Sequence, residues 1–303
     1  WREHVFSEPF YRLIYGDGDG LPGVVIDRFG DLLSLQVTTA GAMAQLEFLI
    51  AQLIDVVQPR GILLRNDAAS EGEGLTASTE VIYGEVPETA VLIENGLEFE
   101  FPIYEGQKTG WFFDHRESRK QLKTFARDAK VLDLFCYLGG WGLQAAQAGA
   151  QSVHCVDRSA LALEYLQRNA KRQGVDDRVS VSQEAVDQWL KGAIAAGEKY
   201  DVVVLDPPAF IKRRKDQRRG EQAYHRINQQ AVKLLSNNGI LVSASCSLHL
   251  TREQQNNIVR LAANKQQLRA DIIYRGGLGA DHPSVAAIPE MDYLKTLFAR
   301  VSG

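Results

Sequence analysis

The chain has 303 residues, of which 45% are hydrophobic and 24% are charged, and its formal net charge at pH 7 is −4. These values are typical of a globular protein that is long enough for one large or two ordinary domains. They exclude a globally basic nucleic-acid binder, so any contact with a nucleic acid requires a local basic segment.

Targeting and redox features follow from the same sequence. No apolar run approaches the roughly 20 residues of a membrane-spanning helix, and the first residues do not have the order of a secretion signal. Cys136, Cys155 and Cys246 are too few and too scattered for a disulfide framework or a zinc site. We therefore expect a cytoplasmic protein without a metal. The chain begins with Trp1 instead of methionine, and we expect a segment ahead of it.

Residues 1–103 are predicted to form a small α+β domain that serves as a scaffold or an RNA-docking unit. Residues 23–38 alternate around a central turn, which is typical of a hairpin. Apolar spacing over 42–57 predicts a helix, and strict alternation over 96–103 predicts a strand. The turn-rich stretch 67–78 is predicted to be an exposed loop.

Residues 104–303 are predicted to form a second, larger domain. From residue 130 onward, buried runs of Val, Leu and Ile alternate with helical segments, one of which begins after Ser159 and ends at Gly174. Such runs joined by helices are typical of a parallel sheet covered on both faces. We expect the α/β class, with a doubly wound Rossmann-like sheet that is mostly parallel and has a terminal antiparallel strand.

Two predicted strand ends carry residues suited to a ribose-bearing cofactor, because ligands of doubly wound sheets bind at the carboxyl ends of the strands. At the first end, Asp133 precedes a turn that contains Gly139 and Gly140. At the second end, about 20 residues further on, Asp157 can accept hydrogen bonds from both hydroxyls of a ribose. Sites for NAD, FAD and S-adenosylmethionine all fit this pattern, and so does a purely structural turn.

A third strand end favours one of these alternatives. Asp206, Pro207, Pro208, Ala209 and Phe210 close a buried strand, and the prolines fix the backbone into a rigid shelf. The carboxylate before the shelf and the ring after it can hold a planar base by edge hydrogen bonds and stacking. The dinucleotide pattern G-x-G-x-x-G is absent, so a nicotinamide oxidoreductase is a remote alternative. A rigid turn without a ligand is the structural alternative.

Together, the segments "DLFCYLGG", "CVDRS", "LDPPAF" and "SCS" resemble the class I S-adenosylmethionine-dependent methyltransferases. More narrowly, the chain resembles the RlmI-type family of rRNA cytosine-C5 methyltransferases over nearly its whole length. The wider match rests on "DGLPGVVIDRFG", "GQKTGWFFDHRESR" and "ADHPSV" followed by "YLK". Family members usually carry an RNA-binding PUA domain ahead of this region, so the resemblance implies such a domain before Trp1.

The resemblance implies a first set of cofactor contacts. Asp133 and the turn from Tyr137 to Gly140 would cradle the methionine part of S-adenosylmethionine, and Asp157 would hold its ribose. Lys108 and Arg116, in "KTGWFFDHR", are the expected polar contacts of the same pocket. The cofactor-binding residues that these motifs add are Phe135, Arg158 and Ser159.

The chain departs from the family pattern after its third predicted strand. An aspartate commonly meets the adenine amine there, whereas this chain has Ala185. Glu184 or Asp187 would have to substitute for it.

Cys246 is the candidate nucleophile. A thiolate that adds to C6 of cytosine turns C5 into an enamine-like carbon that can accept a methyl group, so C5 methylation requires an activated cysteine. Cys246 follows the strand next to the one that ends at Asp206, and in the family this position bears the nucleophile. The structural alternative is a small buried hydrophobe, which is the role we expect for Cys136 and Cys155.

Asp206 is assigned to the N3/N4 edge of a flipped cytosine, where it would stabilise charge during the attack on C6. Some RNA cytosine methyltransferases carry a second cysteine after the proline of the shelf, but here that position is Pro208. Release of Cys246 therefore requires another base. His282 and Lys212 are candidates, and a bound water is the preferred alternative.

The basic stretch "IKRRKDQRRG", residues 211–220, follows the shelf directly. Its structural alternative is a solvated loop, but its position favours salt-sensitive contacts with RNA phosphates. The expected substrate-binding residues are Pro207, Pro208, Phe210, Lys212, Arg213 and Arg214.

The expected function is therefore transfer of a methyl group from S-adenosylmethionine to C5 of a cytosine in large-subunit rRNA. One alternative is methylation of a guanine nitrogen, for which Cys246 would be dispensable. A second is an RNA-binding module that keeps the cofactor pocket as a relic. The expected partner is rRNA, with no membrane and no metal, and the oligomeric state stays open.

Overall fold

The computed structural model describes residues 1–66 and 73–303. The chain forms two compact units, one made of residues 1–116 and 279–291 and the other of residues 117–278 and 292–303. The main segment of the first unit thus ends later than the predicted boundary between residues 103 and 104, and the return of residues 279–291 to this unit was not predicted.

Packing explains why the first unit extends beyond residue 103. Trp111 is buried, and its indole Nε1 donates to Glu94 Oε2 at 2.9 Å. The ring of Phe113 stacks on Phe29, with centroids 5.5 Å apart. In the returning segment, Asp281 accepts a hydrogen bond from the backbone N–H of Arg12 at 3.1 Å. These contacts tie both segments to strands of the first unit.

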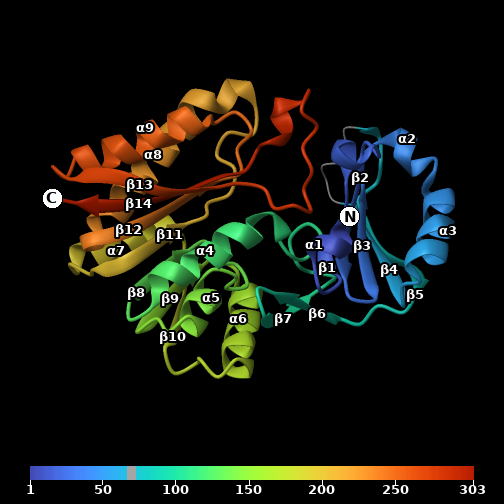
Figure 1. The fold of residues 1–303 in the computed structure, drawn as a ribbon, viewed down its shortest axis with the longest axis horizontal. Helices are drawn as coiled ribbons and strands as arrows, with labels where there is room; N and C mark the ends of the chain where they lie inside the picture. The colour runs from blue at the N-terminus through green and yellow to red at the C-terminus, as the bar shows by residue number, and fades with distance from the viewer. Residues whose placement is uncertain (67–72) are drawn as a thin grey trace. The chain divides into compact units, whose positions relative to one another are not determined.

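The first unit is built on a five-stranded sheet in the order β1-β2-β3-β4-β5, in which only the β3–β4 pair is parallel (Figure 1). The predicted hairpin is confirmed as β2 and β3, which turn at Gly30 with φ of 69°. A separate hairpin of β6 and β7 follows. The strands are β1 (Phe10–Tyr15), β2 (Val24–Phe29), β3 (Leu32–Val37), β4 (Gly61–Asn66), β5 (Ser78–Gly84), β6 (Thr89–Glu94) and β7 (Leu97–Pro102).

The predicted helix over 42–57 is split into two. The short α2 (Ala40–Met43) is capped by Thr39, whose hydroxyl accepts from the N–H of Ala42, and α3 (Leu46–Val57) follows. A short α1 (Arg2–Val5) precedes the first strand. Of the loop predicted over 67–78, residues 67–72 lie outside the described residues, and Ser78 already belongs to β5.

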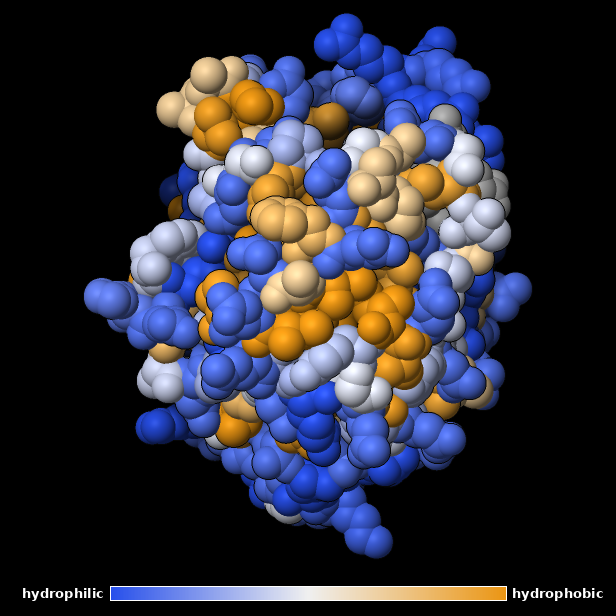
Figure 2. Space-filling view, turned by 90° about the vertical axis from the view of Figure 1, so that its right-hand side faces the viewer, coloured by the Kyte–Doolittle hydropathy of each residue, from blue (hydrophilic) through white to orange (hydrophobic). Residues whose placement is uncertain are grey.

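Helix α3 carries apolar side chains on the face that packs against the sheet and also on its outer face, where an amphipathic helix would have polar residues. Its inner side chains, such as Leu53, join the core formed with β2, β3 and β4. On its outer side Phe48 and Val56 are 65% and 76% exposed. Figure 2 shows apolar side chains gathered on the face where α2 and α3 lie in Figure 1.

The second unit contains a seven-stranded sheet in the order β10-β9-β8-β11-β12-β14-β13. Strand β14 runs antiparallel to both of its neighbours, and the pairs among β8 to β12 are parallel. This confirms the predicted Rossmann-like sheet with its antiparallel strand. The strands are β8 (Lys130–Leu134), β9 (Ser152–Asp157), β10 (Val179–Gln183), β11 (Tyr200–Leu205), β12 (Leu235–Ser245), β13 (Arg269–Gly276) and β14 (Lys295–Ser302).

Helices cover both faces of this sheet (Figure 1). Leu132, Leu134 and Val156 point to the face covered by α7, α8 and α9, and because side chains alternate along a strand, Asp133 and Cys155 point to the opposite face. The helices are α4 (Arg116–Ala126), α5 (Gly142–Gln147), α6 (Ala160–Arg172), α7 (Val186–Ala195), α8 (Gln217–Lys233) and α9 (Arg252–Asn264). Ser159 caps α6 as predicted, accepting from the N–H of Ala162.

The order of the strands reverses beside β8, because the chain proceeds outward through β9 and β10 and then returns to β11 on the other side. In doubly wound sheets the ligand site lies beyond the carboxyl ends of the strands at such a switch point. The turns after β8, β9 and β11 are therefore the place to look for a functional site.

Candidate functional site

Three carboxylates gather at the carboxyl ends of neighbouring strands. Asp133 lies in β8, Asp157 ends β9, and Asp206 follows β11 directly. Asp133 is fully buried, and its pKa is raised from 3.8 to about 7, mainly by burial. The charges of Asp206 and Asp157 contribute to this rise, while the N–H of Gly142 and the charge of Arg119 oppose it. The three acids predicted from separate strand ends thus lie within electrostatic range of each other.

The turn between β8 and α5 contains strained backbone. Phe135, Tyr137 and Gly139 have φ angles of 63°, 49° and 80°, a left-handed conformation that costs about 1 kcal/mol for a residue other than glycine. A Cβ atom on Gly139 would lie 2.7 Å from Cγ of Leu166, so the turn also needs glycine for close packing. Such strain persists where the surrounding structure imposes it, often at functional sites. The predicted cofactor-binding residues Phe135, Tyr137, Gly139 and Gly140 all lie in this turn.

Asp157 holds the turn in this conformation. Its Oδ2 accepts the N–H of Tyr137 at 3.0 Å, and its Oδ1 accepts the N–H of Ser159 at 2.9 Å. Each oxygen keeps a further lone pair, because a carboxylate offers about four acceptor sites. Asp157 can therefore accept additional hydroxyl groups without releasing the backbone.

These residues fit the predicted cofactor, S-adenosylmethionine, which carries a cationic sulfonium, an ammonium and a ribose diol. Within the described residues, the buried Oδ1 of Asp133 has no hydrogen-bond partner, and a buried acceptor without a donor is costly. The clustered negative charges suit a cationic ligand. The two carboxylate oxygens of Asp157 suit a diol.

The raised pKa of Asp133 predicts a pH dependence of folding stability. Between pH 3.8 and about 7 the folded protein keeps a proton on Asp133 that the unfolded chain has lost. The free energy of unfolding therefore falls as the pH rises through this window. We expect thermal denaturation of the ligand-free protein between about pH 4 and 7 to show this fall, and Asp133→Asn to show a smaller one. Equal falls in both proteins would contradict the prediction.

The residues that were predicted to meet the adenine follow β10. The N–H of Glu184 donates to the carbonyl of Asp157 at 3.0 Å, and Ala185 directly precedes α7. Glu184 and Asp187 are both exposed, and Asp187 forms an ion pair with Arg226 at 3.3 Å. The assignment of either acid to the adenine amine stays a prediction. Arg158 is exposed beside Asp157.

Lys108 and Arg116 belong to the first unit, whereas the other predicted cofactor residues belong to the second. Arg116 is buried, its guanidinium donates to the carbonyl of Phe10, and it lies 4.5 Å from the ring of Phe6. Lys108 Nζ lies 5.2 Å from the ring of Phe112. Their assignment to the cofactor stays a prediction.

The shelf after β11 is joined to the segment that carries Cys246. Strands β11 and β12 are parallel, with Leu205 opposite Ser243. The N–H of Ile211 donates to Ser247 Oγ at 3.2 Å, so the chain just beyond the shelf is bonded to the chain just beyond Cys246. This arrangement brings the ends of both strands to one edge of the sheet.

Tyr224 in α8 links the same two segments. Its hydroxyl lies 2.8 Å from Ser247 Oγ and accepts from Ser245 Oγ at 3.0 Å. Its ring packs against Phe210 with centroids 4.8 Å apart. Sequence reasoning missed Tyr224, because an apolar-facing tyrosine in a helix carries no signal of a special role.

Trp141 is a second residue that the sequence did not single out. It is buried, and its Nε1 donates to Asp206 Oδ2 at 3.0 Å. The indole thereby orients the carboxylate that was predicted to meet the base. The only available signal was its position directly after Gly140.

The three cysteines differ in exposure. Cys246 is half-buried, whereas Cys136 and Cys155 are buried. Burial, together with the neighbouring Cys155 thiol, raises the pKa of Cys136 well above its ordinary value. A thiol held in its neutral form is a poor nucleophile, so Cys246 is the accessible candidate.

The basic segment beyond the shelf is exposed. Within the part of the chain that the structure describes, Lys212, Arg213 and Arg214 form no ion pair. A groove of about 460 Å³ begins at Phe210 and Lys212. It continues along α8, past Arg219 and Arg226. An aromatic ring and several cations thus border one hollow beside the shelf.

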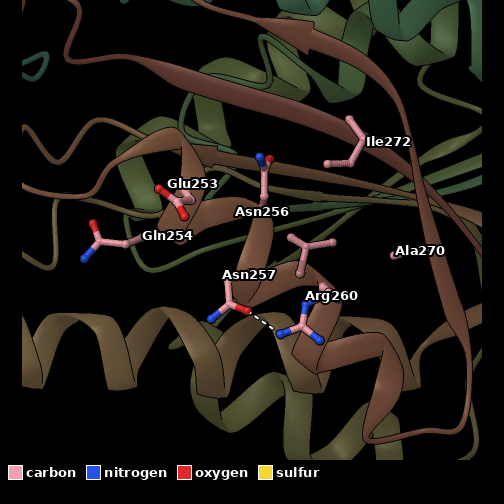
Figure 3. A pocket seen from close by; sticks show the side chains of 8 residues that line it. Glu253, Gln254, Asn256, Asn257, Arg260, Ala270 and Ile272 are labelled. Carbon is pink, nitrogen blue, oxygen red and sulfur yellow. Dashed lines mark hydrogen bonds between the residues drawn. The ribbon is translucent and has the colours of Figure 1, made fainter.

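A larger groove of about 610 Å³ lies between α9 and β13 (Figure 3). Arg260 donates to Asn257 Oδ1 at 2.6 Å there, and the other polar lining is mainly amide side chains such as Gln254 and Asn256. None of the predicted site residues lines this groove, and the candidate site is therefore at the strand ends.

Over residues 1–66 and 73–303, no group of three or more His, Cys, Asp or Glu side chains is arranged to hold a metal ion. In the same ranges, every helix is too short or too polar to cross a membrane.

Comparisons with known proteins agree with the geometry. The family model described as S-adenosylmethionine-dependent methyltransferase matches residues 55–251. The chain is 38% identical over 294 residues to the ribosomal RNA large subunit methyltransferase I of Shewanella amazonensis, covering 96% of this chain and 74% of that protein. The same values describe the protein of that name from Tolumonas auensis.

Solved structures show the same fold. A Streptococcus mutans protein described as a SAM-dependent methyltransferase superposes with a TM-score of 0.86 at 23% identity, over 99% of this chain and 77% of that one. Trm5b from Pyrococcus abyssi gives a TM-score of 0.69 at 16% identity, over 92% and 75% of the two chains. Both likenesses extend over most of the chain and so include both units.

Proposed function

Because the chain belongs to the ribosomal RNA large subunit methyltransferase I family of S-adenosylmethionine-dependent methyltransferases, we propose that it methylates C5 of a cytosine in large-subunit rRNA through a covalent adduct at Cys246. The relatives' name supports rRNA as the substrate. Such a substrate would place the enzyme in the cytoplasm.

The observation that carries the proposal is the position of Cys246. It is the half-buried cysteine of the described chain, and it follows β12 at the edge where β11 ends in Asp206 and the shelf. The bond between Ile211 and Ser247 keeps these two segments together. A nucleophile and a platform for a planar base thus come from adjacent strand ends.

The chemistry requires a thiolate and a proton acceptor. A bond forms between Cys246 Sγ and C6 of the cytosine, and the electron pair of the C5–C6 double bond becomes available at C5. S-adenosylmethionine, when bound, would supply the methyl group that C5 accepts, and its sulfur would keep the electron pair of the broken S–CH3 bond. Loss of the proton from C5 restores the double bond and breaks the C6–S bond, which frees Cys246. A water or Lys212 is proposed to take that proton, with His282 as the further candidate.

Asp206 is proposed to bind the N3/N4 edge of the flipped base. Trp141 occupies one side of its carboxylate, and this bond fixes the direction in which the remaining lone pairs point. A fixed acceptor stabilises the charge that develops on the ring without reorganising during the reaction.

The cofactor is proposed to lie over the turn after β8. Asp133 would accept a hydrogen bond from its ammonium, because Oδ1 of Asp133 is buried without a partner. Asp157 would accept the two ribose hydroxyls, because each of its carboxylate oxygens can accept a further hydrogen bond. Glu184 is the proposed contact for the adenine amine.

The proposed RNA contacts are Pro207, Pro208, Phe210, Lys212, Arg213 and Arg214. The last three are exposed. Lys212 lines the groove beside the shelf, and Arg213 and Arg214 come directly after it in the chain. Phosphates that bind there would displace only solvent. The first unit is proposed to serve as a scaffold or an RNA-docking unit.

The decisive test uses rRNA that contains 5-fluorocytosine, incubated with the protein and S-adenosylmethionine. Fluorine at C5 cannot leave as a proton does, so attack by a thiolate traps the protein on the RNA. We expect an adduct that survives denaturation and that is lost in Cys246→Ala.

Other outcomes would overturn the proposal in distinct ways. Methyl transfer to unmodified rRNA without any adduct would indicate methylation of a base nitrogen. Cofactor binding without transfer to any RNA would indicate an RNA-binding module with a relic pocket.

A further inference from the structure

Lys295 is a buried cation beside Cys246. It is only 3% exposed, and it opens β14, where it pairs with Ser245 of β12 in the antiparallel ladder. Ser245 is the residue before Cys246. The Nζ of Lys295 donates to the carbonyl of Ser247, the residue after Cys246, at 2.9 Å. The lysine therefore contacts the chain on both sides of the candidate nucleophile.

In the described parts of the chain, no carboxylate lies within ion-pair distance of Lys295. The carboxylate whose charge acts on Lys295 is that of Asp292, and both of its oxygens accept from Arg252 Nη2 at 3.2 Å. Burial lowers the pKa of Lys295 to about 8, while Asp292 and Cys246 act in the opposite direction. Lys295 is thus a buried ammonium whose charge is not balanced by an acid of its own.

A buried ammonium without an anionic partner is unfavourable, and a well-packed apolar side chain at such a position is usually as good or better for stability. Most residues around Lys295 in the chain follow that rule, since Leu294, Leu297 and Phe298 are apolar and buried, and the buried polar Thr296 is uncharged. The lysine therefore has no obvious role in packing, and its charge is the property to be explained.

We propose that Lys295 is a positioning residue that stabilises the thiolate form of Cys246. This inference rests on the proposed function of Cys246 as the nucleophile. The proton of Cys246 passes to solvent and Lys295 keeps its own. The neutral thiol thereby becomes an anion that balances the charge already present on Lys295.

The other ionisable groups that face this pair do not take over the role. Tyr224 is held by the hydroxyls of Ser245 and Ser247, and burial raises its pKa, so it stays neutral. Arg252 is engaged by Asp292 and by the carbonyl of Gly276 at 2.9 Å. Within residues 1–66 and 73–303, the ammonium of Lys295 donates only to a neutral carbonyl.

The test measures the alkylation of Cys246 by iodoacetamide as a function of pH, read by mass spectrometry of the peptide that contains it. Lys295→Gln keeps a hydrogen-bond donor for the carbonyl of Ser247 and removes the charge, and Lys295→Met removes both. In both variants we expect the midpoint of the alkylation profile to rise by about one pH unit, so that the rate near neutral pH falls about tenfold. Lys295→Arg should restore most of the rate.

The matched control is Arg300→Met, which removes an exposed charge from the same strand and should leave the profile unchanged. Circular dichroism establishes that each variant is folded. An unchanged profile in folded Lys295→Gln would overturn the inference, and if only Lys295→Arg folds, a profile shifted upward in that variant would overturn it too.

The fluorocytosine experiment separates this inference from the proposed function. An adduct in the wild type together with an unchanged alkylation profile in Lys295→Gln overturns the inference alone. A shifted profile without any adduct overturns the proposed function, because the thiolate would then exist without attacking the base.

Discussion

Replacing Cys246 with alanine is expected to abolish methyl transfer to rRNA while binding of S-adenosylmethionine survives. Without the thiolate, C5 of cytosine is not activated, and removal of a covalent nucleophile lowers turnover by at least about a thousandfold. The proposed cofactor residues follow β8 and β9, whereas Cys246 follows β12, with β11 in between. Transfer of a labelled methyl group and titration calorimetry with the cofactor measure the two properties separately.

The matched control for this variant is Cys155→Ala. Cys155 is buried in β9 beneath α5, so the substitution should lower stability slightly and leave turnover intact. Full activity of Cys246→Ala would exclude the covalent mechanism. Loss of cofactor binding together with activity would show that the variant damages the sheet edge as a whole.

Replacing Asp157 with alanine is expected to weaken the binding of S-adenosylmethionine itself, in contrast to Cys246→Ala, which should leave this binding intact. Its carboxylate accepts the N–H groups of Tyr137 and Ser159, and these bonds hold the strained turn and the start of α6 together. Hydrogen bonds to a charged group contribute about 1.5 kcal/mol or more each, so losing two corresponds to roughly a hundredfold loss of affinity. Titration calorimetry with S-adenosylmethionine measures this directly.

Two further variants make this result specific. Asp157→Asn keeps one acceptor oxygen and should show an intermediate loss of about tenfold. Glu164→Ala removes an exposed acid from α6 and should bind the cofactor normally. Unchanged affinity in Asp157→Ala would mean that the turn keeps its conformation without the carboxylate.

The strand ends of the second unit could be predicted from sequence because each strand and the turn after it form one short, continuous segment of the chain. Buried runs of Val and Leu mark β8 and β11, and the residues that follow them, from Tyr137 to Gly140 and from Asp206 to Phe210, belong to the same segments. A parallel sheet brings such ends to one edge whatever the order of its strands. Local pattern was therefore sufficient to gather Asp133, Asp157 and Asp206.

The features that were missed depend on contacts between distant parts of the chain. Residues 279–291 join the first unit through bonds such as that from Arg12 to Asp281, and no local pattern reports such a partner. Lys295 opens an ordinary-looking strand, and only its pairing with Ser245 reveals its neighbour Cys246. The ion pair of Asp187 in α7 with Arg226 in α8 likewise joins two separate segments and has no signal in the local sequence.

The place of β14 in the sheet has a consequence for the order of assembly during synthesis. Strand β14 is made after β13 but lies between β12 and β13, and β13 pairs with the sheet only through it. A nascent chain that stops before residue 295 therefore leaves β13 without a neighbour and the carbonyl of Ser247 without its lysine. If Lys295 activates Cys246, the thiol stays unreactive on the ribosome until β14 has emerged and inserted. A growing chain would then carry no reactive nucleophile next to the very RNA that the finished enzyme is proposed to modify.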